Sequence, residues 1–236
     1  MSTAPRPAPP GVDDLDTWPT ATPHVMYPVS DGKPMAESTR QFQWIVTIQG
    51  NLDVLYGPRA DVFVGGDNFV YPVEGQPGVN VAPDVYVAFG RPKGHRPSYK
   101  VWEEGGTFPQ VVFEVLSPNN TYTEMQDKRK FYQKYGAEEY YVYDPEANRF
   151  EAWVRQGRRL VEIVDPNGRV SPRLGIRFDT SGAELVIYRP DGKRFLTFVE
   201  LGMLAKQEKK KADQEKKRAD KLAARLRELG VDPDSV

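Results

Sequence analysis

The chain has 236 residues and a formal charge of −1, with no cysteine and two histidines. This length suffices for one ordinary domain with its own core, and the lack of cysteine excludes disulfides, thiolate zinc sites and cysteine nucleophiles. No apolar run approaches the roughly 18 residues of a membrane span and the first residues lack a signal-peptide pattern, so we expect a cytoplasmic protein without membrane contact.

Charge is distributed unevenly along the chain. Residues 206–221 hold eight of the 32 Lys and Arg residues but only four of the 33 Asp and Glu residues, so the rest of the chain is net acidic. Proteins that bind duplex nucleic acid without sequence discrimination usually carry a broad basic face. The overall balance therefore argues mildly against such a face, and only local basic clusters remain.

The first third of the chain contains an arm, a helix and short strands. Residues 1–34 are rich in Pro, Asp, Ser and Thr, which predicts an irregular arm. From Glu37 apolar residues recur every three or four positions, which indicates a helix that ends at Gly57-Pro58. Two strand-like pieces, residues 61–64 and 68–71, then predict a hairpin or a meander.

Two further strands each carry one acidic residue. Residues 81–89 form a β-branched and aromatic run with Asp84 near its start, and residues 111–116 form another with Glu114 in the middle. Burying an unpaired charge is far more costly than burying a neutral polar group, which already costs roughly 2–7 kcal/mol. We therefore expect a metal ion or a lysine beside Glu114.

A helix is predicted after the Glu114 strand. Thr121-x-x-Glu124, or Thr123-x-x-Gln126, offers a capping box, and Gly136 supplies the stop. Glu124 and Lys128 lie four positions apart and so share a helix face. Two strand acids and this lysine could form a divalent-metal hydrolytic site, or Glu114 and Lys128 could be a structural ion pair while Asp84 caps a loop.

The rest of the chain predicts short strands and then a long charged helix. The strands are expected near residues 139–144, 150–154, 160–164, 175–178 and 185–188, which with the earlier elements indicate an α/β domain with a mixed sheet flanked by helices over residues 35–200. Residues 201–236 form a separate segment, and an apolar seam that begins at Phe198 recurs on alternating threes and fours. This predicts a weak coiled coil that assists a homodimer, or equally a solvated single helix.

Missing motifs narrow the chemistry. The chain has no phosphate-binding Gly-rich loop, no Gly-x-Gly-x-x-Gly fingerprint, no Gly-x-Ser-x-Gly elbow and no His-Glu-x-x-His pair. Carboxylate chemistry remains, and hard oxygen ligands prefer Mg²⁺ or Mn²⁺. On the residues alone, Asp84 and Glu114 are the candidate metal ligands.

An ordered set of motifs resembles the Uma-type putative restriction endonuclease family, a branch of the PD-(D/E)XK nuclease superfamily, over roughly residues 25–200. The motifs are Pro83-Asp84, residues 114–118 (Glu-Val-Leu-Ser-Pro), Lys128 with Tyr132, residues 136–140 (Gly-Ala-Glu-Glu-Tyr) and Asp144-Pro145. The resemblance implies a restriction-endonuclease-like core in which Asp84 and Glu114 hold the metal. Lys128 then replaces the lysine that the superfamily has two residues after the second acid, where this chain has Leu116.

The resemblance also implies that Glu37 approaches the site as a further acid, with Glu124 as a supporting one. Three positions depart from the branch: Glu124 replaces the usual Asp, Asn120 replaces the usual Thr, and Gln41 replaces a common His. We expect a Mg²⁺-dependent endonuclease that acts on DNA. The alternatives are a catalytically inactive nuclease fold that binds partners through its C-terminal helix, and an enzyme that hydrolyses RNA.

Overall fold

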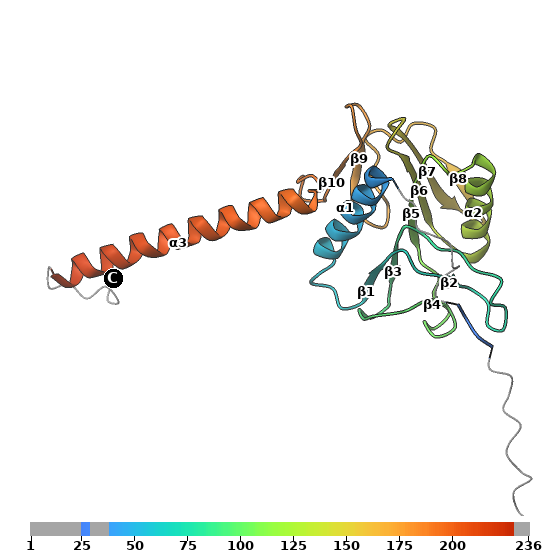
Figure 1. The fold of residues 1–236 in the computed structure, drawn as a ribbon, viewed down its shortest axis with the longest axis horizontal. Helices are drawn as coiled ribbons and strands as arrows, with labels where there is room; N and C mark the ends of the chain where they lie inside the picture. The colour runs from blue at the N-terminus through green and yellow to red at the C-terminus, as the bar shows by residue number, and fades with distance from the viewer. Residues whose placement is uncertain (1–24, 29–37, 229–236) are drawn as a thin grey trace, which may run out of the picture.

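A six-stranded mixed sheet forms the centre of the molecule in the computed structural model, which describes residues 25–28 and 38–228 (Figure 1). The strands of this sheet lie in the order β1-β3-β5-β6-β7-β8. Their bounds are β1 Val62–Gly65, β3 Val85–Phe89, β5 Val111–Val115, β6 Glu139–Asp144, β7 Arg149–Gln156 and β8 Arg159–Glu162. The only parallel pair in this sheet is β5 with β6, which the helix α2 (Tyr122–Tyr135) connects.

Two small sheets flank the central one. One pairs β9 (Arg177–Asp179) with β10 (Val186–Tyr188), and the other pairs β2 (Val70–Tyr71) with β4 (Tyr99–Lys100). The predicted hairpin or meander of the first two strands is wrong, because β1 pairs with β3 and β2 pairs in parallel with β4.

One face of the central sheet packs against α1 (Thr39–Leu55). Ile45, Ile48 and Leu52 of this helix are buried against alternate strand residues such as Val111 and Phe113. Phe178 of β9 and Ile187 of β10 pack in the same cluster. The buried residues of α1 recur every three or four positions, as the sequence predicts for one apolar helix face.

The other face packs against α2 and the β2–β4 pair. Tyr132 of α2 is fully buried beside Tyr140, with ring centroids 5.1 Å apart. Tyr99 of β4 and Val70 of β2 complete this second cluster. Residues of β5 alternate between the two clusters, as a strand buried on both faces requires.

Local signals set the ends of α2 as the sequence predicts. The side chain of Thr121 accepts a hydrogen bond from the backbone N–H of Glu124 at 3.2 Å, which satisfies a donor that the helix leaves open. Gly136 ends the helix with φ 110°, in the left-handed region that glycine adopts without a side-chain clash.

The helix α3 (Phe198–Glu228) projects away from the body, and none of its residues is buried (Figure 1). Asn51 fixes the segment that leads into it: the Asn51 amide donates to the Leu196 carbonyl at 2.7 Å and accepts from the Leu196 N–H at 3.0 Å. Within residues 25–28 and 38–228, no helix is long and apolar enough to span a bilayer.

Candidate active site

Strand register brings Asp84 and Glu114 to the same face of the sheet. Val85 is the Cα partner of Phe113 in the antiparallel β3–β5 ladder, so one further step places Asp84 opposite Glu114. Opposite residues of an antiparallel pair point to the same face. For these two residues it is the face covered by α2, because Val85 and Phe113 belong to the α1 cluster.

Glu114 lies at the centre of a closed hydrogen-bond network. Its side chain is 3% exposed. Lys128 Nζ donates to Glu114 Oε2 at 2.9 Å, and the Tyr132 hydroxyl donates to Glu114 Oε1 at 2.5 Å. The lysine expected beside Glu114 is therefore present, and it comes from the first half of α2.

Lys128 is a cation in this setting. Burial acts to lower its pKa, but the carboxylates of Glu114 and Asp84 outweigh burial, and the pKa is raised above its ordinary value. The Nζ atom also lies 3.4 Å from the Ala82 carbonyl oxygen. Lys128 thus joins the Asp84 segment and the Glu114 strand, and it cannot act as a general base near neutral pH.

Tyr132 remains protonated for a related reason. Burial raises the pKa of its hydroxyl well above the usual value, and the neighbouring Glu114 charge raises it further. The hydroxyl is therefore a donor to the carboxylate. The bond fixes the orientation of Glu114.

Backbone contacts position Asp84 at the start of β3. Its Oδ2 atom accepts a hydrogen bond from the Val115 N–H at 2.6 Å, one residue beyond Glu114. A Cβ added at Gly66 would lie 2.3 Å from the Asp84 carbonyl oxygen, so only glycine permits this close approach. The side chain is partly exposed, between the core and solvent.

Gln41 reaches the same edge of the sheet from α1. Its Nε2 donates to the Val115 carbonyl at 2.8 Å, and its side chain is 5% exposed. The Oε1 atom is buried without a hydrogen-bond partner among the described residues. Such an atom costs free energy unless something else satisfies it, so an amide oxygen that can accept a hydrogen bond or bind a cation lies close to Val115.

Side-chain oxygen atoms gather at this edge of the sheet, and oxygen is the ligand type that a hard divalent cation prefers. Asp84, Glu114 and Gln41 offer oxygen atoms, which Mg²⁺ and Mn²⁺ prefer, and each carboxylate oxygen can bind more than one partner. No group of three or more His, Cys, Asp or Glu residues that could hold a metal occurs among the residues described.

Of the two other predicted site residues, the structure describes only Glu124. Glu124 is exposed, and its carboxylate lies 3.4 Å from the Asn120 amide nitrogen. Its charge still contributes to the raised pKa of Lys128. Glu37 lies outside the described residues.

Tyr132 and Gln41 contact the candidate site, but the sequence alone assigned neither of them a role there. Tyr132 lies four residues after Lys128 and so on the same helix face, a spacing that could have revealed it. Gln41 is 74 residues from the carbonyl that it binds, and no local pattern indicates such a contact.

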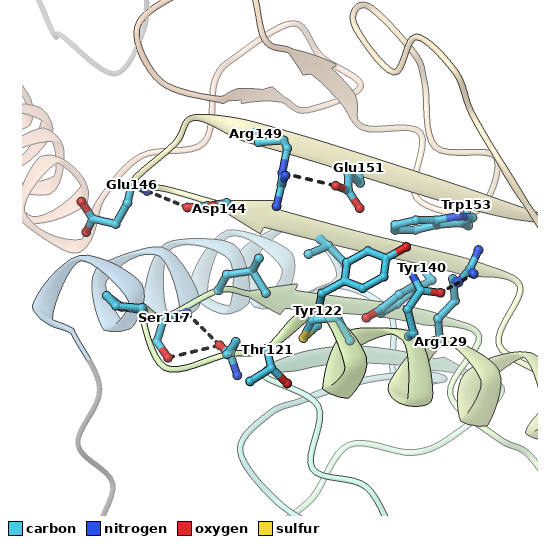
Figure 2. Close-up of a pocket in the computed structure, with 16 residues that line it drawn as sticks. Ser117, Thr121, Tyr122, Arg129, Tyr140, Asp144, Glu146, Arg149, Glu151 and Trp153 are labelled. Atoms are coloured by element: carbon cyan, nitrogen blue, oxygen red, sulfur yellow. Dashed lines mark hydrogen bonds and ion pairs between the residues drawn. The ribbon is translucent and has the colours of Figure 1, made fainter.

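A pocket lies beside this network on the same face of the sheet. Its walls are the first half of α2, the strands β6 and β7 and the loop of residues 116–121, and its volume is about 280 Å³ (Figure 2). We call it the Trp153 pocket. Leu116, which lines the pocket, stands two residues after Glu114 and so faces the same side.

The fold is a mixed sheet between helices, with an acid–lysine network at the ends of two of its strands. The family model described as "Uma2: Putative restriction endonuclease" matches residues 12–193. The chain therefore belongs to the Uma2 family.

Two further comparisons accompany this match. A crystal structure of "a putative nuclease belonging to DUF820" from Anabaena variabilis is similar at 15% sequence identity and a TM-score of 0.43. The similarity covers 59% of this chain and 74% of the other. No curated protein matches the chain.

Proposed function

We propose that the chain is a Mg²⁺- or Mn²⁺-dependent endonuclease that hydrolyses phosphodiester bonds of DNA. Membership of a nuclease family supports a nucleic acid substrate. The observation that carries the proposal is the meeting of Asp84, Glu114 and Lys128 on one face of the sheet. These three residues come from β5, from α2 and from the segment before β3, so the fold brings them together from three separate elements.

In this proposal Asp84 and Glu114 hold the metal ion. The ion would supply Lewis-acid chemistry and a more acidic bound water. Lys128, as a cation, would orient the attacking water or stabilise charge that develops on the phosphate. Tyr132 would keep Glu114 in position, and Glu124 would add negative charge at the rim.

A catalytically inactive nuclease fold is the second candidate. The observation that favours it is the closed network around Glu114, in which Lys128 and Tyr132 already bind both carboxylate oxygens. Such a network is stable without a metal ion. The exposed helix α3 would then provide the contact with a partner.

Replacing Glu114 tests the enzymatic proposal. Glu114→Gln should lower metal-dependent DNA cleavage by at least about 100-fold, because one ligand and one charge are lost at the reacting centre. A plasmid-nicking assay with Mg²⁺ or Mn²⁺ measures this rate. Cleavage at the wild-type rate would remove Glu114 from the mechanism.

Glu139→Gln is the matched control. Glu139 is also a buried glutamate, 1% exposed, but it accepts hydrogen bonds from Tyr141 and Ser171 on the α1 side of the sheet. This variant should lose stability but keep the cleavage rate below its own unfolding temperature.

Metal titration separates the two candidates. Isothermal calorimetry of the wild-type protein should show Mn²⁺ binding that Glu114→Gln weakens if the site is catalytic. An inactive module should bind neither Mg²⁺ nor Mn²⁺. A parallel cleavage assay with an RNA of the same sequence decides between the two sugars.

A further inference from the structure

Stacked aromatic rings form part of the wall of the Trp153 pocket. The Trp153 ring stacks on Tyr140 with centroids 5.3 Å apart. Trp153 and Tyr140 are 4% and 1% exposed. Trp153 Nε1 and the Tyr140 hydroxyl lack a hydrogen-bond partner among the described residues, but both atoms are closed off from solvent, so a ligand in the cavity would contact the ring surfaces of the wall and not these two atoms.

One aromatic side chain of the pocket is open to solvent. Tyr122, at the start of α2, is 79% exposed. Figure 2 shows its ring extended from the helix toward β7, with Trp153 on the opposite wall. A large exposed aromatic residue at the mouth of an aromatic-lined cavity is suited to stacking on a flat ligand.

Charge in the pocket disfavours an anion. Asp144, Glu146 and Glu151 line it together with Arg129 and Arg149. Arg149 is paired with Glu151 at 3.3 Å, and the Arg129 guanidinium lies over the Trp153 ring at 5.4 Å. A phosphate group would meet the carboxylates, whereas a neutral base can donate its amino hydrogens to them.

The pocket lies beside the candidate active site, with Tyr132 and Tyr140 packed between them. Val142, which lines the pocket, is the Cα partner of Glu114 on the adjacent strand. Adjacent strands lie roughly 5 Å apart, so β6 and β7 lie about 5–10 Å from the strand of Glu114. The Tyr132 hydroxyl donates a hydrogen bond to Glu114, and the Tyr132 ring packs on Tyr140 with centroids 5.1 Å apart. Packed side chains therefore link Glu114 to the wall of the pocket.

The volume of the Trp153 pocket is consistent with the binding of one small planar group. The cavity of about 280 Å³ is close to the lower end of the roughly 300–1,000 Å³ of ligand pockets. The loop of residues 116–121 is held in place by the Asn120 side chain, which accepts from the Ser117 N–H at 2.8 Å. The pocket is therefore preformed on this side.

We propose that the Trp153 pocket binds one unpaired nucleobase next to the phosphate that is cleaved, with Tyr122 stacked on the base. This inference rests on the proposed function and narrows it to a substrate with at least one base out of the duplex, such as a single strand, a flap or a distorted site. Nucleases and other enzymes that need an unpaired base read it by stacking and by its hydrogen-bonding edge.

Binding without cleavage tests the pocket. The full chain is titrated in EDTA, by fluorescence anisotropy, with a single-stranded DNA oligomer and with an abasic oligomer of the same length. The wild-type protein should bind the base-bearing oligomer more tightly. Tyr122→Ala should lower that affinity by roughly 5- to 100-fold, the effect of losing one base–aromatic stack, and should leave the affinity for the abasic oligomer unchanged.

Phe198→Ala is the control for losing an exposed aromatic ring. Phe198 is 78% exposed, nearly as much as Tyr122, but it lies at the start of α3. This variant should bind as the wild type does, and thermal unfolding should show both variants to be folded. An RNA oligomer of the same sequence identifies the preferred sugar.

The following outcomes would contradict the proposal that the Trp153 pocket binds a base. Equal wild-type affinity for the two DNA oligomers, or no effect of Tyr122→Ala, would show that no base is bound there. If cleavage still depends on Glu114 in that case, the nuclease proposal stands without the pocket. Loss of both the base preference and the Glu114-dependent cleavage would overturn both proposals.

Discussion

At the residue scale, the Glu114–Lys128 pair explains how a carboxylate can lie inside the most apolar strand of the chain. Glu114 is 3% exposed and Lys128 21% exposed, so the pair is largely removed from water. Taking two charges out of water is costly, and their attraction offsets that cost only with good geometry and further hydrogen bonds. Tyr132 supplies one of these bonds.

Removing only the lysine should therefore destabilise the protein strongly. Lys128→Met leaves the Glu114 carboxylate buried without its cation, and we expect the free energy of unfolding to fall by about 3–5 kcal/mol. The double variant with Glu114→Gln should recover part of this loss, because neither charge remains. Urea unfolding of the two single variants and the double variant measures the coupling, and additive effects would mean that the pair contributes nothing jointly.

The direction of the Lys128 pKa shift predicts the pH range in which the pair acts. A folded-state pKa raised above the ordinary 10.5 means that the contribution to stability is fully present below that value. The contribution is lost only as the pH rises through the raised pKa. The cleavage rate should accordingly show no titration of Lys128 near neutral pH.

Residue-level prediction from sequence succeeded where a signal was local. A single acid in an apolar strand predicts a cation nearby, and the pair with Lys128 lies within 14 positions. The buried amide of Gln41 could not be placed, because its contact with Val115 depends on how α1 docks on the sheet. The role of Glu37, outside the described residues, stays a prediction.

At the scale of elements, α2 contributes residues both to the network around Glu114 and to the wall of the Trp153 pocket. Lys128 and Tyr132 face Glu114, whereas Met125 and Arg129 line the Trp153 pocket. The position of this one helix therefore couples the acid network to the pocket. Its ends are defined by Thr121 and Gly136.

Gly136→Ala should loosen the end of α2. The backbone at Gly136 has φ 110°, and although no atom lies within 4 Å of an added Cβ, an L-residue in the left-handed region costs roughly 1–2 kcal/mol. Gly78→Ala is the matched control, because an added Cβ also has open space there but the φ of Gly78 lies outside the left-handed region. Thermal unfolding should show a lower midpoint for Gly136→Ala alone, and equal midpoints would contradict the strain.

Element prediction failed where pairing is not local. The strand β4 is only two residues long, within a Gly- and Pro-rich stretch, so no alternation reveals it. The strand β1 pairs with β3 across an intervening segment, and short loops between strand-like pieces favour the hairpin that does not form. The caps of α2, by contrast, lie within a few residues of the helix and were predictable.

At the scale of the whole molecule, α3 projects from the body, and none of its described residues is buried (Figure 1). Its 31 residues span roughly 46 Å at 1.5 Å per residue, and seam side chains such as Phe198 and Leu222 are exposed along it. We propose that its apolar seam pairs with a second copy of the chain. The excess of Lys and Arg over Asp and Glu in this helix would limit the strength of that pairing.

Deleting residues 203–236 should halve the mass measured by light scattering if α3 carries the dimer. Leu222→Lys tests the same contact without truncation, because Leu222 lies on the seam and is 58% exposed. Met203→Lys is its control, since Met203 is 65% exposed but lies off the seam. An unchanged mass in the truncated chain would move any dimer contact to the globular body.

The exposure of α3 has a consequence for how the protein melts. An isolated helix gains little from its neighbours and frays gradually in water, whereas the sheet and its covering helices share one core and unfold cooperatively. Since no residue of α3 is buried, a single chain on heating would lose helical circular dichroism over a broad range before the core gives way. A midpoint from that signal alone would average two unrelated transitions, and near-ultraviolet dichroism of the buried tyrosines would report the core separately.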